Sequence, residues 1–398
     1  MINLKELTEF YLKLKDLEID YKELIKKYFL SILFLIIVLK AFFLIETLHY
    51  ILAVLLIFII FQKIKYFNEI NKYIIYVNLF PVYCLLSSFW SLDPYWTFKR
   101  SVFLIIISLG LSISIFFYYK GKNFLINLLP ANLLLIGLSL FSLIFNIPDD
   151  MWTGGNAMGF KGFAVHQNTL ASLIIFTLPG IFLFKKNKLL ISLLFIVSLI
   201  ILLLTYSRAS IISLLLMMIF YLTYENKKNL ILLLTFLLLI VNSYFFLPGF
   251  KHTINKLLLK SGNHILERRS ELWLASFNAA KLGNLFGLGY GISSPEVNIS
   301  RYRLNNDGRI IREKGNSVLA LIEEVGIIGL LIFLIPIGLA IKYSIKNYKN
   351  NINLIVLTMV LGMIIHAQFE AWWVGPGSVQ YPLFLIYVNY LIFNNTLK

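Results

Sequence analysis

The chain has 398 residues, of which 59% are hydrophobic and 14% are charged. Soluble domains are about half apolar and about one quarter charged, so this composition excludes an ordinary water-soluble protein and predicts an integral membrane protein. The formal net charge of +16 does not indicate nucleic-acid binding, because most lysines stand in short clusters between apolar segments, as in the cytoplasmic loops of membrane proteins.

Residues 1–27 are predicted to form an amphipathic segment on the cytoplasmic membrane surface. Its large apolar side chains fall near one face of a helix, and charged side chains occupy the rest: the apolar set is Leu4, Leu7, Tyr11, Leu14 and Leu24. Packing of this helix against the membrane bundle is the alternative. The segment does not resemble the short basic start of a cleaved signal peptide, so we expect the first membrane helix to be an uncleaved anchor.

The sequence predicts an all-α, polytopic membrane protein with about twelve transmembrane helices. Helices one to nine are expected within residues 28–247 and helices ten to twelve within residues 316–398. The apolar segments are 28–46, 48–62, 73–90, 101–119, 124–146, 167–184, 189–206, 209–224, 229–247, 316–341, 352–371 and 378–393. Lys40 and Glu46 interrupt the first two segments, so eleven helices is the alternative.

The lysine clusters predict that both termini are cytoplasmic. The clusters fall in alternate loops, with members at Lys63, Lys120, Lys185, Lys227 and Lys342. Residues 248–315 then form one large extracytoplasmic loop, which contains eleven Lys or Arg against five Asp or Glu. A loop of this length can translocate despite its charge. Its basicity suits an anionic ligand, and a merely solvated basic loop is the alternative.

Two motifs stand at predicted extracytoplasmic helix ends in the first half of the chain. Residues 87–101, SSFWSLDPYWTFKRS, contain a turn at Asp93 and end with Arg100. Residues 160–172, FKGFAVHQNTLAS, place His166 and Asn168 at the start of a helix. The alternatives are a structural histidine at a membrane boundary and an asparagine that only caps the helix. Lys161 and Arg100 are among the few cations of the short extracytoplasmic loops.

Arg208 stands between two long apolar segments, in the sequence LLTYSRASIIS. An arginine at the centre of a bilayer costs about 2.5 to 3.5 kcal/mol on insertion scales, and less near the interface. We therefore expect this side chain to have an anionic partner or ligand. Snorkelling to the interface, or pairing with a carboxylate such as Glu370, is the alternative.

The predicted large loop contains the motif ERRSELWLASFNAAKLGNLFGLGYG at residues 267–291. Arg269 and Trp273 are placed on a helix that leads into Gly287, Gly289 and Gly291. Glycines permit close approach of a backbone to a ligand, and the tryptophan ring offers a face to a sugar or lipid.

Two further motifs lie near the ends of the last helices. REKGNSVLALIEEVGIIGLL opens helix ten with Asn316 and includes Glu324, for which a buried ion pair is the alternative to catalysis. HAQFEAWWVGPGS places His366 and Glu370 on one helical face. This spacing alone does not predict a metal site, because a third convergent ligand is not evident. The single cysteine, Cys84, excludes an intrachain disulfide and a multi-cysteine metal site.

The six motifs, taken in order over residues 80–385, resemble the O-antigen ligase and polymerase family. For the first five motifs the matching patterns are Trp-Ser-x-Asp-Pro with a later Arg, Gly-Phe-x-x-x-x-Asn-x-Leu, Ser-Arg-small, Arg-x-x-x-Trp leading into Phe-Gly-x-Gly-x-Gly, and Asn-x-x-Leu-x-x-x-x-Glu-x-Gly-x-x-Gly. The resemblance implies that Arg208 contacts a lipid pyrophosphate. Ligases of the family carry a histidine immediately before the Asn, where this chain has Gly315. This departure favours polymerisation and leaves the catalytic base open between His166, Glu324 and Glu370.

The resemblance implies an extracytoplasmic glycosyltransferase of a bacterial cytoplasmic membrane. It would polymerise polyprenyl-pyrophosphate-linked repeat units into O-antigen, capsule or exopolysaccharide, without a metal or other cofactor. The expected partners are the lipid-linked donor and acceptor, membrane lipids and, as a further candidate, a chain-length regulator. The alternatives are a ligase that transfers glycan to lipid A core or protein, and a flippase or transporter of lipid-linked glycans.

Each candidate residue has an expected role in this reaction. Catalytic roles fall to Arg208 and Arg269, which would stabilise the departing pyrophosphate, and to Glu324 and His166. Substrate-binding roles fall to Arg100, Lys161, Asn168, Trp273, Asn316 and Glu370.

Overall fold

The computed structural model describes residues 21–42, 47–63, 72–118, 124–153, 159–182, 188–225, 228–229, 231–235, 267–294, 302–304, 310–312, 314–347 and 350–396. Residues 1–20 of the predicted surface segment (1–27) and most of the predicted ninth helix lie outside these described residues. So does much of the predicted large loop, including residues 248–266.

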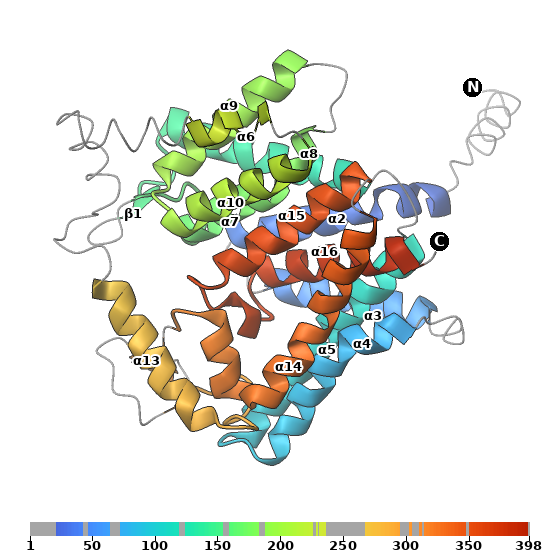
Figure 1. The fold of residues 1–398 in the computed structure, drawn as a ribbon, viewed down its shortest axis with the longest axis vertical. Coiled ribbons are helices and arrows are strands. Elements are labelled where there is room, and N and C mark those ends of the chain that lie inside the picture. Colours follow the sequence, from blue (N-terminus) through green and yellow to red (C-terminus); the bar gives the residue numbers. More distant parts are fainter. Residues whose placement is uncertain are drawn as a thin grey trace, which may run out of the picture.

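The described part of the chain is almost entirely helical (Figure 1). Its longer helices are α2 (Tyr21–Phe42), α3 (Thr47–Lys63), α4 (Lys72–Leu86), α5 (Pro94–Tyr118), α6 (Leu129–Phe145), α7 (Gln167–Thr177), α9 (Lys188–Leu204), α10 (Arg208–Glu225), α13 (Glu267–Gly283), α14 (Ser317–Lys346), α15 (Asn351–His366) and α16 (Gln380–Thr396). Short helical turns are η2 (Ser87–Phe89), η3 (Phe124–Leu128), α8 (Pro179–Phe182) and η5 (Trp372–Val374). Two antiparallel pairs join β1 (Trp152–Thr153) to β2 (Gly159–Phe160) and β3 (Tyr302–Leu304) to β4 (Ile310–Arg312).

Five of the described helical segments are long and apolar enough to cross a membrane: Lys72–Phe89, Pro94–Tyr118, Phe124–Phe145, Arg208–Glu225 and Ser317–Lys346. Shorter apolar helices occupy Tyr28–Phe42, Tyr50–Lys63, Gln167–Ile181, Lys188–Leu204 and Asn351–His366. The chain is therefore a helical membrane protein, and the total of twelve spans stays a prediction. The helix α2 begins at Tyr21, before the predicted boundary at residue 28, because YKELIKKY continues as good helix formers.

The helix α16 lies in the middle of the bundle, between α15, α14, α5 and α7 (Figure 1). Every residue from Tyr381 to Phe393 is buried, as expected of a helix that is apolar on all sides. Its polar groups bond neighbouring helices: Tyr387 Oη donates to the Phe176 carbonyl at 2.5 Å, and Gln380 Nε2 donates to Ser172 Oγ at 2.9 Å. These bonds attach α16, which follows the last sequence motif, to α7.

The connections that carry the sequence motifs lie at one end of the bundle, called here the motif end. In Figure 1 this end is at the left, marked by β1 and α13, whereas α16 ends at the opposite side. The helix α13 packs beside the bundle against α14. The folded helices therefore bring segments from distant parts of the sequence to one place.

Candidate active site

The last motif, residues 366–378, is the hub segment of the motif end because it bonds four of the other motifs. Arg100 Nη2 donates to the Val374 carbonyl at 2.9 Å, and Asn168 Nδ2 donates to Glu370 Oε1 at 2.7 Å. His366 Nε2 lies 3.3 Å from the hydroxyl of Ser210, two residues after Arg208. The motif whose spacing alone did not predict a metal site is thus the one that connects the others.

The helix α14 is broken at Gly326, where φ is 72° and ψ is −176°. The break frees carbonyls before it and N–H groups after it, and such groups need partners when they are buried. The turn between α13 and α14 supplies them. Leu288 N donates to the Glu323 carbonyl and Gly289 N to the Glu324 carbonyl, each at 2.9 Å.

The N–H groups that follow the break donate to carbonyls of the same turn. Ile327 N donates to the Asn284 carbonyl at 3.2 Å, and Ile328 N donates to the Leu285 carbonyl at 3.1 Å. A Cβ at Gly287 would overlap the Glu324 carbonyl. The sequence suggested that these glycines admit a ligand, but Gly287 approaches the backbone of α14, Gly289 approaches Ser91 and Gly291 approaches the Arg100 side chain.

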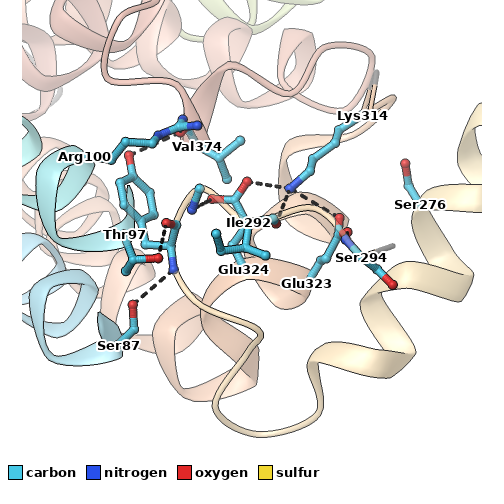
Figure 2. Close-up of polar contacts among 12 residues, drawn as sticks. Ser87, Thr97, Arg100, Ser276, Ile292, Ser294, Lys314, Glu323, Glu324 and Val374 are labelled. Carbon is cyan, nitrogen blue, oxygen red and sulfur yellow. Dashed lines mark hydrogen bonds and ion pairs between the residues drawn. The ribbon is translucent and has the colours of Figure 1, made fainter. Parts of the chain in front are cut away.

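Beside the break, four charged side chains alternate in sign (Figure 2). In order they are Arg100, Glu324, Lys314 and Glu323. Lys314 Nζ lies 2.5 Å from Glu324 Oε1 and 3.3 Å from Glu323 Oε2. Both carboxylates are buried, with 3% and 0% of their side chains exposed. Gly291 N donates to Glu324 Oε2 at 2.6 Å, and the Arg100 side chain packs against Gly291 on its other side. The glycine-rich turn therefore lies between the Arg100 side chain and the Glu324 carboxylate.

This arrangement favours the ion-pair role for Glu324 over a catalytic role. One of its oxygens accepts from Lys314 and the other from Gly291 N. Glu323 is fixed in the same way, because its Oε1 accepts from Ser294 N at 2.7 Å. A carboxylate bonded at both oxygens by the protein is a poor acceptor for a substrate proton.

Lys314 and Glu323 were not predicted as site residues, although the sequence contains a signal for them. Two adjacent carboxylates inside an apolar helix cannot both be buried without a cation nearby. Lys314 stands three residues before the helix starts, and it supplies that cation.

Arg100 lies between two aromatic rings, 5.9 Å from the centroid of Trp96 and 5.5 Å from that of Tyr290. Tyr290 Oη donates to Val374 O at 3.2 Å, the same carbonyl that Arg100 contacts. Burial raises the pKa of Tyr290 well above its ordinary value, so the phenol stays protonated and keeps this bond. The guanidinium is therefore rigidly oriented at the motif end.

Asn168 and His166 lie at the start of α7. His166 caps this helix, because its Nδ1 accepts from Asn168 N at 3.1 Å, and its side chain is exposed. Asn168 uses its side chain to bond Glu370 instead of capping the helix. Lys161, before them, donates to Asp150 Oδ2 at 2.6 Å and holds the pKa of that carboxyl below its ordinary value.

Arg208 is the first residue of α10 and is half-buried. It follows Tyr206, whose positive φ of 52° turns the chain between α9 and α10. A cation in the first turn of a helix faces the positive end of the helix dipole, which is unfavourable. An anion at the same place would interact favourably with both the guanidinium and the helix end. The position thus suits an anionic ligand.

His366 is fully buried, and both of its ring nitrogens have partners. Trp372 Nε1 donates to Nδ1 at 3.2 Å, and Nε2 faces Ser210 Oγ at 3.3 Å. An indole N–H can only donate, so the neutral ring carries its proton on Nε2. The spacing of His366 and Glu370 is therefore explained by bonding within the bundle.

Trp273 and Asn316 meet at the start of α14. Trp273 Nε1 donates to the Gly315 carbonyl at 3.2 Å, and its ring lies 6.0 Å from that of Phe369 in the hub segment. Asn316 caps α14, because its Oδ1 accepts from the N–H groups of the two residues after Ser317. Arg269 lies in the first turns of α13, and its side chain is outside the described residues. The expected convergence of Arg269 with Arg208 stays a prediction.

The geometry defines a class of protein, a helical membrane bundle whose motif residues gather at one end around the hub segment. Residues 193–334 match the model of the O-antigen ligase family, so this part of the chain is similar to that family. The match includes Arg208, Arg269, Trp273 and Glu324, and it does not include the hub segment. A comparison with curated proteins gave no match.

The family match has consequences that do not depend on individual residues. It supports a membrane enzyme of the ligase or polymerase type, which acts on lipid-linked glycans in a bacterial membrane. It gives no support to the flippase alternative.

Proposed function

We propose that the chain is an extracytoplasmic polymerase that joins polyprenyl-pyrophosphate-linked oligosaccharide units into O-antigen, capsule or exopolysaccharide. The observation that carries the proposal is that two motifs bond the hub segment beside Gly315: Asn168 bonds Glu370, and Asn316 bonds Gln368. Glycine at this position, where ligases of the family have histidine, favours the polymerase over the ligase.

The motif end faces away from the cytoplasm in this proposal. The opposite helix ends carry lysines, including Lys63 at the end of α3, Lys72 at the start of α4, Lys188 at the start of α9 and Lys346 at the end of α14. Lysine-rich loops stay in the cytoplasm during membrane insertion. The distribution supports a cytoplasmic location for that end and an inner-membrane protein with an outward site.

The reaction is a single displacement at the anomeric carbon of the donor sugar. The acceptor hydroxyl oxygen forms the new glycosidic bond, the bond from carbon to the phosphate oxygen breaks, and the lipid pyrophosphate leaves with the electron pair. A general base takes the hydroxyl proton. Arg208 and Arg269 stabilise the charge on the leaving pyrophosphate through bidentate hydrogen bonds, without a metal ion.

The remaining candidates position the sugars. Trp273 offers a ring face beside Phe369, and Asn316 and Asn168 orient the hub segment next to it. Arg100 and Lys161 place cations around the same end, where they would attract the anionic donor. His166 lies exposed beside Asn168 and would meet the acceptor. A chain-length regulator is a further proposed partner.

The test is a reconstitution of the purified chain in vesicles with a polyprenyl-pyrophosphate oligosaccharide as the only glycan and a chelator present. We expect a ladder of longer lipid-linked glycans and release of polyprenyl pyrophosphate. Transfer only after addition of lipid A core or an acceptor protein would instead identify a ligase. Movement of the donor across the bilayer without a new glycosidic bond would contradict the enzyme assignment.

A further inference from the structure

A chain of buried hydrogen bonds connects the hub segment to the first turn of α10. Trp372 Nε1 donates to His366 Nδ1 at 3.2 Å, and the proton on His366 Nε2 faces Ser210 Oγ, 3.3 Å away. Ser207 Oγ also donates to Ser210 Oγ, at 3.1 Å. All four side chains are at most 5% exposed. A hydroxyl oxygen has two lone pairs, so Ser210 can accept both bonds, and the chain ends at the residue immediately before Arg208.

The turn between α9 and α10 has a backbone that needs such support. Tyr206 has a φ of 52°, in the left-handed region that residues with a Cβ rarely adopt, so this conformation persists only where the surroundings hold it. Within the turn, Ser207 N donates to Thr205 Oγ1 at 3.2 Å. Gly159 of β2 lies so close that a Cβ there would overlap the Thr205 carbonyl. The turn is thus held by β2 before Tyr206 and by the hub segment after it, and Arg208 follows directly.

His366 is the member of this chain that joins separate helices. It is the last residue of α15, which packs against α10, and its ring lies 5.5 Å from the ring of Phe176 in α7. A guanidinium that binds a phosphate through two parallel N–H bonds must be held in direction as well as in place. A small rotation of the first turn of α10 would therefore weaken the contact of Arg208 with a pyrophosphate.

We propose that His366 is the positioning residue of Arg208. Its bond to Ser210 fixes the first turn of α10 in the orientation in which Arg208 contacts the lipid pyrophosphate. The inference rests on the proposed transferase function and on the role of Arg208 in it. His366 takes no part in the bond changes of the transfer, and its effect on the reaction passes through Arg208.

Two variants of His366 separate its two hydrogen bonds. Glutamine places an amide N–H near the position of Nε2 and can still donate to Ser210, whereas asparagine is shorter and can keep only the bond from Trp372. Ser210→Ala removes the acceptor of the first bond. Ser213→Ala is the matched control, because the buried Ser213 hydroxyl lies about one turn further along α10 and makes no hydrogen bond within the described part of the chain.

The test measures the rate of chain extension in vesicles and the affinity of each purified variant for polyprenyl pyrophosphate, at equal amounts of folded protein. We expect Ser210→Ala and His366→Asn to lose about fivefold to fiftyfold in both quantities, because a displacement of about 1 Å in a site costs up to about a hundredfold. His366→Gln should recover most of this loss. Ser213→Ala should match wild type in both quantities.

Repetition of Ser210→Ala in the Arg208→Ala background distinguishes positioning from general support of the fold. If the hydroxyl acts through Arg208, the second substitution should change rate and affinity by less than about twofold, because the two residues then act as a unit. An undiminished loss in that background would overturn the proposal. Wild-type rate and affinity in His366→Asn would also overturn it, as would equal losses in His366→Asn and His366→Gln.

Failure of the proposed function gives a different result from failure of this inference. Wild type that binds polyprenyl pyrophosphate but forms no ladder would contradict the transferase function. The affinities of the Ser210 and His366 variants, with and without Arg208, would then still decide whether His366 positions Arg208.

Discussion

Replacement of Arg208 by Ala is expected to reduce chain extension by at least about tenfold to a hundredfold, because each charge-assisted hydrogen bond contributes roughly 1.5 to 3 kcal/mol. The residue starts α10, where its charge is unfavourable unless an anion is present. Arg208→Lys should rescue poorly, since a point charge cannot reproduce the planar fork of a guanidinium. The same results are expected for Arg269→Ala and Arg269→Lys.

The measurement is glycan chain length in cells at matched protein levels. Lys99→Ala is the control, because Lys99 is an exposed cation near the same end of the bundle. The control should produce polymer of normal length. Normal polymer from Arg208→Ala would remove Arg208 from the site, and normal polymer from Arg269→Ala would do the same for Arg269.

Replacement of Gly326 by Ala is expected to remove most of the folded protein. Residues other than glycine rarely adopt the backbone angles of this position, at a cost of about 1 to 3 kcal/mol. The added Cβ would also overlap the Leu285 carbonyl, which accepts the bond from Ile328 N. To avoid this overlap, α14 and the turn after α13 would have to move apart. The hydrogen bonds that the turn makes to the backbone around Gly326 would then be lost.

Gly338→Ala is the matched control in the same helix. A Cβ there has no neighbour within 4 Å, and alanine favours a helix over glycine by about 1 kcal/mol. The measurement is the amount of monodisperse protein in detergent and its thermal midpoint. Equal midpoints for Gly326→Ala and Gly338→Ala would show that the break in α14 does not require glycine.

The sequence predicted the positions of the helices because apolar segments and polar connections are local signals. It also showed which connections contain the motifs, since polar and aromatic residues stand out between apolar segments; the site roles of these motifs stay predictions. The break in α14 could not be predicted in this way. Residues 316–341 have the composition of one continuous helix, and the partners of the broken backbone lie in the turn after α13.

The roles within the site depended on tertiary contacts. The sequence left the base open between His166, Glu324 and Glu370, and it could not tell which of the two carboxylates is held in an ion pair. The structure separates them: Glu324 is bonded by Lys314 and a backbone N–H, whereas Asn168 reaches Glu370 from a segment about two hundred residues away. These side-chain contacts depend on which helix ends lie together in the fold, and local sequence patterns do not predict which helix ends do so.

The most direct test of the outward-facing site is cysteine labelling with a membrane-impermeant maleimide. Cys84 is buried, so introduced cysteines can be followed without removing it. A cysteine at Asn278, exposed on α13, should react in cells whose cytoplasmic membrane is intact. A cysteine at Asn351, exposed at the start of α15, should react only after permeabilisation. The reverse pattern would place the motif end in the cytoplasm and contradict an extracytoplasmic transferase.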